Sequence, residues 1–260
     1  MDVGNEYAST LMLTSDGDQV HASCSGVLLS PRVALTAASC VCPPRQLSAR
    51  GVPAKGSIGP ADCAERAFLM TVRLGGVKDP EFEEESVAQT FRRFEGKVRV
   101  HPSFKLELDE QGAVLSTQAD LAIILLDSPA QEPLPRVSLA ETEVQENELL
   151  VMAGYGDDPR YRGVPGIRYF RRNRVTQLHA SVEGRVLYEQ QGSFVYNGYT
   201  GGPCFREDHG HRWLVGIASV GTDRELPFSS TFFFRKWLQA GLKRAAAADL
   251  ASAPAPQHPQ

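Results

Sequence analysis

The apolar residues of this chain come in short, β-branched segments, and Gly, Pro, Asp and Asn clusters separate them. Segments of this kind and length are typical of strands joined by turns. In the first half of the chain we predict strands at residues 9–13, 20–29, 68–74, 97–100 and 121–126. In the second half we predict strands at residues 149–154, 168–178, 213–220 and 229–233. Many short strands favour an all-β protein, built as a sandwich or as a pair of barrels.

One helix is expected, at residues 234–250, where Trp237, Leu238 and Leu242 precede an alanine-rich run. Residues 251–260 are rich in Pro and Ala, and we predict a disordered tail there. A chain of 260 residues can form two small domains. We therefore expect one unit at residues 1–128 and a second at 129–233, before the helix and the tail.

Charge and composition exclude several classes of function. The net charge of −4 provides no basic surface for nucleic acid or for membrane lipids. The opposite charge runs at residues 81–85 and 168–174 are interpreted as solvated faces. No stretch approaches the roughly 20 apolar residues of a membrane span, and residues 1–4 do not resemble a signal peptide. We expect a cytoplasmic protein, or a secreted or periplasmic one if an export signal has been removed.

Five cysteines, an odd number, leave at least one thiol free or paired with another chain. A zinc site at Cys40, Cys42 and Cys63 is disfavoured, because the spacing fits no common zinc motif and no histidine is near. We expect no metal and no cofactor. In an oxidising compartment, Cys42 and Cys63 could close the Pro- and Gly-rich loop between them.

Three motifs occur in the order and at the spacing of one known family. They are CSGVLLSPRVALTAASC at residues 24–40, DLAIILL at 120–126 and GYTGGP at 198–203. Together they resemble the trypsin/chymotrypsin family of serine proteases, in which the third motif is GDSGGP. The resemblance spans residues 3–245. It implies two antiparallel six-stranded β-barrels with a C-terminal α-helix, and a disulfide between Cys24 and Cys40.

The resemblance assigns the catalytic positions to Ser39, Asp120 and Thr200, and the oxyanion-hole positions to Gly198 and Thr200. Catalysis in this family needs a histidine base, which the carboxylate orients. Ser39 stands in the place of that histidine and has no useful basicity near neutral pH. Losing the base costs on the order of 10⁴ to 10⁶ in rate. The sequence therefore predicts a catalytically degenerate homologue.

Two further departures support this prediction. Tyr199 replaces the aspartate that pairs with a new amino terminus in the family, and residues 2–5 (DVGN) replace the terminal motif itself. Phe194 and Phe228 fall at the floor and wall of the specificity pocket, where we expect their rings to fill it.

We predict a pseudoprotease that acts as a protein-binding or regulatory module, with a protein partner that the sequence does not identify. The segment at residues 155–172 has the aromatic and arginine content typical of interface hot spots. Its candidate partner-binding residues are Tyr155, Tyr161, Arg162, Tyr169 and Arg171. The loops at residues 42–63 and 80–85 are alternative surfaces.

The competing hypothesis is an active serine-type endopeptidase. It would use Thr200 as the nucleophile and a replacement base such as His21 or His179. A third possibility, the deliberate inactivation of an active protease, is disfavoured because four positions depart from the family, namely Ser39, Tyr199, Thr200 and Phe228.

Overall fold

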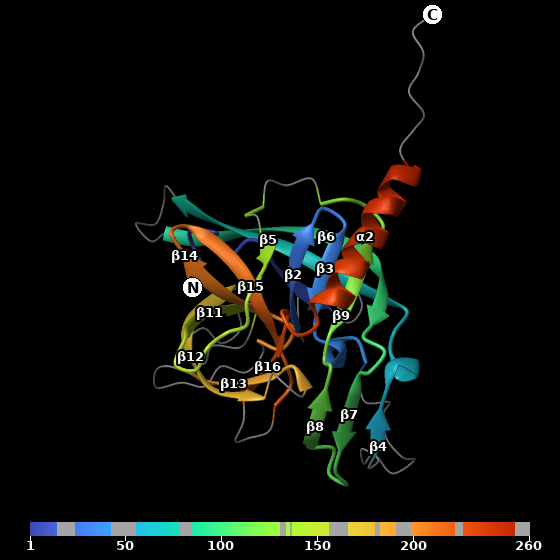
Figure 1. Ribbon diagram of the computed structural model, residues 1–260. Coiled ribbons are helices and arrows are strands. Elements are labelled where there is room, and N and C mark those ends of the chain that lie inside the picture. The colour runs from blue at the N-terminus through green and yellow to red at the C-terminus, as the bar shows by residue number, and fades with distance from the viewer. Residues whose placement is uncertain are drawn as a thin grey trace, which may run out of the picture.

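The computed structural model describes residues 1–14, 24–42, 56–78, 85–130, 134–135, 137–155, 166–179, 183–190, 199–221 and 226–252. Across these ranges the chain forms two β-barrels side by side, with helix α2 (Arg235–Ser252) on the outside (Figure 1). Among the described residues, no helix has the length and apolar character needed to cross a membrane.

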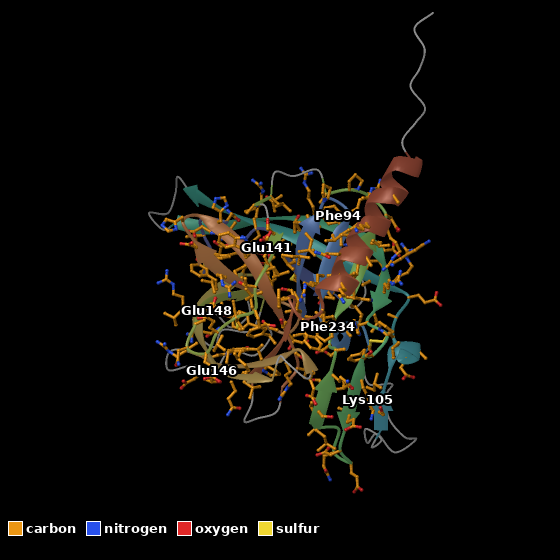
Figure 2. All side chains as sticks on the ribbon, in the orientation of Figure 1. Phe94, Lys105, Glu141, Glu146, Glu148 and Phe234 are labelled. Carbon is orange, nitrogen blue, oxygen red and sulfur yellow. A yellow bond between two sulfur atoms is a disulfide. The ribbon has the colours of Figure 1, made fainter. Side chains whose placement is uncertain are left out.

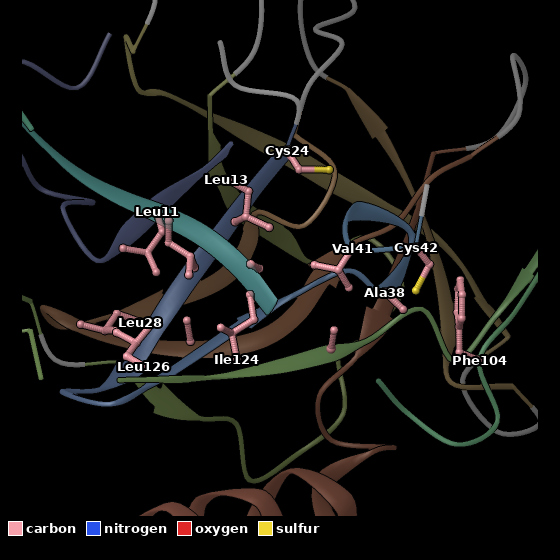
Figure 3. Close-up of a cluster of buried hydrophobic side chains, with 14 of the residues drawn as sticks. Leu11, Leu13, Cys24, Leu28, Ala38, Val41, Cys42, Phe104, Ile124 and Leu126 are labelled. Carbon is pink, nitrogen blue, oxygen red and sulfur yellow. The ribbon is translucent and has the colours of Figure 1, made fainter. Parts of the chain in front are cut away.

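The first barrel closes through six antiparallel strands in the order β1-β2-β3-β9-β6-β5. These strands are β1 (Thr10–Thr14), β2 (Cys24–Ser30), β3 (Val33–Thr36), β5 (Arg66–Lys78), β6 (Glu85–Val100) and β9 (Ala122–Leu126). Leu11, Leu28, Ile124 and Leu126 lie in its core (Figure 3). Leu35 and Ile123 point the other way, into a cluster shared with the second barrel and α2. Both faces of β3 and β9 are buried, and all their residues except Thr36, whose hydroxyl donates to the Ser25 carbonyl, are apolar.

The second barrel is formed by β11 (Leu149–Gly154), β12 (Tyr169–His179), β13 (Arg185–Gln190), β14 (Pro203–Asp208), β15 (His211–Ala218) and β16 (Leu226–Ser230). Antiparallel pairing of β15 with β16 closes it, and β10 (Ser138–Leu139) adds a short parallel strand beside β15. Met152, Val175, Val186 and Val215 are buried in its core. The fold class predicted from the sequence is confirmed.

A separate three-stranded sheet projects from the first barrel. It contains β4 (Gly56–Ile58), β7 (Lys105–Leu108) and β8 (Val114–Gln118), and Figure 2 labels Lys105 on it. Leu106 and Leu108 pack inward while Lys105 and Glu107 face outward, the alternation expected of a half-buried strand.

Helix α2 packs against β9 of the first barrel. A Cβ atom placed on Gly241 would lie 2.3 Å from Ile123 Cδ1, so the absence of a side chain there permits the close approach. The helix extends through Ser252, so the prediction of a tail from residue 251 is wrong for residues 251 and 252. The remaining tail, residues 253–260, lies outside the described residues.

Several element predictions differ from the structure. The predicted strands do not include β3, β4, β7, β8, β10, β13 and β14. The strand predicted at 229–233 is wrong beyond Ser230, where the chain turns into α2.

Side-chain hydrogen bonds stabilise this turn. Ser230 Oγ accepts a hydrogen bond from the Phe233 N–H (3.1 Å), and Thr231 Oγ1 donates to the Leu214 carbonyl (2.6 Å).

Candidate functional site

Asp120 lies two residues before β9, and its side chain is buried, with 1% exposed. Its Oδ1 accepts the Ser39 N–H (2.7 Å), while Oδ2 accepts the Ser39 hydroxyl (2.9 Å) and the Ser219 hydroxyl (2.6 Å). The Val220 N–H adds a longer bond of 3.4 Å to Oδ2. Burial raises the pKa of Asp120, and these hydrogen bonds oppose that rise. These hydrogen bonds satisfy the buried carboxylate, and none of them comes from an imidazole.

Ser39 belongs to the short 3₁₀-helix η1 (Ala38–Cys40), which a disulfide ties to β2 through Cys24 and Cys40. This disulfide and the second one, Cys42–Cys63, are as the sequence predicted, and Cys204 is a buried free thiol. The Ser39 hydroxyl donates a hydrogen bond to Asp120, so the two side chains form a closed contact.

Thr200 sits on a tight turn between the two barrels. Its carbonyl accepts the Ser25 N–H (2.8 Å) from the first barrel, and the Gly201 N–H donates to the Ala218 carbonyl (2.7 Å) in the second. Gly201 has φ +81°, and a Cβ atom there would lie 2.1 Å from the Ser25 carbonyl oxygen. Only glycine fits this position. Among the described residues, no hydrogen bond joins the half-buried Thr200 hydroxyl to Ser39 or Asp120.

None of the three histidines whose side chains are described contacts Asp120 or Ser39. His101 packs against Phe234 and Trp237, each with ring centroids 4.9 Å away, and burial lowers its pKa. His209 is exposed and pairs with Asp208, and His211 packs against Trp213. Of the proposed replacement bases, His21 lies outside the described residues, and only the backbone of His179, in β12, is described.

Phe228 lies in β16 with its side chain fully buried in the core of the second barrel. Its ring fills the space over Gly216, where a Cβ atom would lie 2.1 Å from Phe228 Cδ2. Tyr188 and Tyr199 belong to the same cluster. The other predicted pocket residue, Phe194, and the predicted oxyanion-hole residue Gly198 lie outside the described residues.

The predicted partner-binding residues do not form one exposed group. Tyr155 and Tyr169 are buried, with 1% and 5% exposed, so their assignment to a binding surface is wrong. The Tyr155 hydroxyl donates to the Thr10 carbonyl (3.3 Å), and Tyr169 occupies a core-facing position of β12. Arg171 is half-buried, and Tyr161 and Arg162 lie outside the described residues.

A buried ion pair that the sequence does not indicate joins the amino-terminal segment to the second barrel. Arg168 Nε lies 2.6 Å from Asp2 Oδ2, and neither side chain exceeds 1% exposure. The guanidinium also donates to the Val72 carbonyl (2.8 Å) and to the Tyr155 hydroxyl (2.9 Å). The interpretation of residues 168–174 as a solvated run is therefore wrong at Arg168. No sequence signal joins two residues so far apart.

The described residues contain no group of three or more His, Cys, Asp or Glu side chains arranged to hold a metal ion. No curated protein matches the chain. The family model for the trypsin-like peptidase domain matches residues 24–217, which is most of the chain. The two barrels and the position of Asp120 and Thr200 between them agree with that match. The chain therefore belongs to the family of trypsin-like peptidase domains.

Proposed function

We propose that this trypsin-like peptidase domain is catalytically inactive and acts as a protein-binding or regulatory module. The observation that carries the proposal is the closed contact of the Asp120 carboxylate with the hydroxyls of Ser39 and Ser219. In an active relative the carboxylate orients a histidine, which removes the proton of the nucleophile. Here a hydroxyl that cannot act as a base takes that place.

The nucleophile position and the pocket support the same proposal. A threonine hydroxyl becomes a useful nucleophile only when a neighbouring base removes its proton. Phe228 occupies the barrel interior beside the Thr200 turn, where a substrate side chain would need space. The Gly201 turn and both barrels are nevertheless retained, so the scaffold remains able to present its surface to a partner.

Incubation with a diverse peptide library, read by mass spectrometry, tests the proposal. We expect no cleavage by the wild type or by Thr200→Ala, while trypsin in a parallel sample cleaves the library. Cleavage by the wild type that disappears in Thr200→Ala would instead support an active endopeptidase with a replacement base. The variants His21→Ala and His179→Ala would then show which histidine supplies the base.

A further inference from the structure

The outer face of β12 carries side chains that the barrel core does not use. Residues of a strand alternate between its two faces. Tyr169, Asn173 and Val175 are buried on the core side, while Phe170 and Arg172 are exposed and Arg174 is half-buried on the other side.

Leu149 on β11 lies directly opposite Arg174 in the antiparallel register. We call Leu149, Phe170, Arg172 and Arg174 the β12 strip.

The apolar members of the β12 strip are exposed but held in place. Leu149 is 51% exposed and Phe170 is 37% exposed. The Phe170 ring packs on the Tyr7 ring with centroids 4.7 Å apart. Tyr7 is fixed in turn by a hydrogen bond to Glu207 (2.9 Å) and by the Arg212 guanidinium 4.4 Å from its centroid. A side chain already ordered in this way loses little entropy when a partner binds.

The two arginines give the β12 strip two positive charges that form no ion pair with the described residues. Within the described part of the chain, no carboxylate lies within ion-pair distance of Arg172 or Arg174. Arg174 donates to the Asn147 carbonyl (3.2 Å), and Glu189, its register partner on β13, forms no ion pair with it.

Two nearby acids, Glu148 and Glu207, are engaged elsewhere. Glu148 pairs with Arg206 (2.5 Å), and Glu207 pairs with Arg212 (2.7 Å). Figure 2 labels Glu148, the residue directly before Leu149 in the chain. These two acids therefore do not neutralise the guanidinium groups of Arg172 and Arg174.

We propose that the β12 strip is the docking surface of this module, and that it binds an extended acidic segment of a partner protein that also carries an apolar side chain. This inference rests on the proposed binding function. Alternate residues of a strand lie roughly 6.7 Å apart, so two carboxylates at alternate positions would meet Arg174 and Arg172. A leucine or phenylalanine at the next alternate position would meet Phe170. An arginine guanidinium binds a carboxylate through two parallel hydrogen bonds. Aromatic residues and arginine are also enriched among the residues that contribute most to binding at protein interfaces.

The probe is a fluorescein-labelled peptide of sequence Gly-Ser-Glu-Ser-Glu-Ser-Leu-Ser-Gly, measured by fluorescence anisotropy with the whole chain. We expect saturable binding that weakens at least about tenfold in Arg172→Glu and in Phe170→Ser, because these residues would contact a glutamate and the leucine of the probe. The matched controls are Lys97→Glu, an exposed charge reversal on β6, and Leu115→Ser, at a position 57% exposed on β8. Both controls should bind like the wild type.

The same experiment separates the two proposals. Absence of binding, or equal binding by wild type, Arg172→Glu and Phe170→Ser, would overturn the β12 strip as the docking surface. If poly-glutamate bound as tightly as the labelled peptide, the proposal would also be overturned, because the β12 strip would then bind anions in general and would not select an apolar side chain. Mass spectrometry of the recovered peptide tests the other proposal. A cleaved peptide would contradict catalytic inactivity whatever the anisotropy shows, and an intact but unbound peptide would overturn the β12 strip alone.

Discussion

Asp120 is the residue whose surroundings most define the site, and its burial makes a prediction about pH. Since burial raises its pKa above the ordinary value of 3.8, the folded chain holds the proton more tightly than the unfolded chain does. The contribution of Asp120 to the free energy of unfolding therefore falls as pH rises from 3.8 through the raised pKa. Asp120→Asn removes this contribution. In urea unfolding we expect the wild type to lose stability relative to Asp120→Asn as the pH rises above 3.8. A difference that stays constant over this range would contradict the assignment.

The buried pair of Asp2 and Arg168 makes a second prediction about single residues. Breaking a buried ion pair by removing one partner leaves an uncompensated charge and costs about 3–5 kcal/mol. We expect this loss in the free energy of unfolding of Arg168→Met, measured by chemical denaturation. The double variant Asp2→Leu with Arg168→Met should recover part of it, because no charge then remains buried. A double variant less stable than the single one would contradict this account.

The sequence located Ser39, Asp120 and Thr200 because each belongs to a short motif whose neighbours are recognisable. It could not locate the pair of Asp2 and Arg168, because nothing local marks two charges that meet only when the amino-terminal segment packs on the second barrel. Tyr155 and Tyr169 show the converse error. Their aromatic character is as typical of a core as of an interface. Only their places in the fold decide: Tyr169 faces the barrel core from β12, and Tyr155 follows β11 and packs in a separate buried cluster.

Among the elements, the turn at residues 199–203 holds the two barrels together, and Gly201 is its tightest point. Gly201 and Gly210 have nearly the same φ, +81° and +80°, but only Gly201 is enclosed, since no atom lies within 4 Å of a Cβ placed on Gly210. Gly210→Ala should therefore cost only the left-handed backbone penalty, about 1–2 kcal/mol. Gly201→Ala adds a clash with the Ser25 carbonyl, and we expect a clearly larger loss of stability. Equal losses in thermal or chemical unfolding would show that the turn is not constrained as described.

Element boundaries were predicted best where apolar residues define them. The strand predicted at 149–154 matches β11, whereas β5 (Arg66–Lys78) and β6 (Glu85–Val100) are much longer than predicted. Arg92 and Arg93 are exposed within β6, and they interrupt the apolar pattern that sequence analysis follows.

For the whole molecule, the cysteines provide a test of the folded state. Two disulfides and one buried thiol, Cys204, predict a single titratable thiol per chain in non-reducing denaturant and none in the native protein. Burial also raises the pKa of Cys204, which lowers its reactivity further. Three or five thiols in the denatured sample would mean that one or both disulfides are absent. Protein disulfides form and persist in oxidising compartments, so a count of one would favour secretion or a periplasmic location.

The central claim is that this peptidase domain contains no activated nucleophile. The most direct measurement is reaction of the whole chain with a fluorophosphonate, which labels activated hydroxyl nucleophiles, read as intact mass beside active trypsin. We predict no mass increase in the wild type under conditions that label trypsin completely. An increase of one phosphonyl group that maps to Thr200 and is lost in Thr200→Ala would contradict the claim.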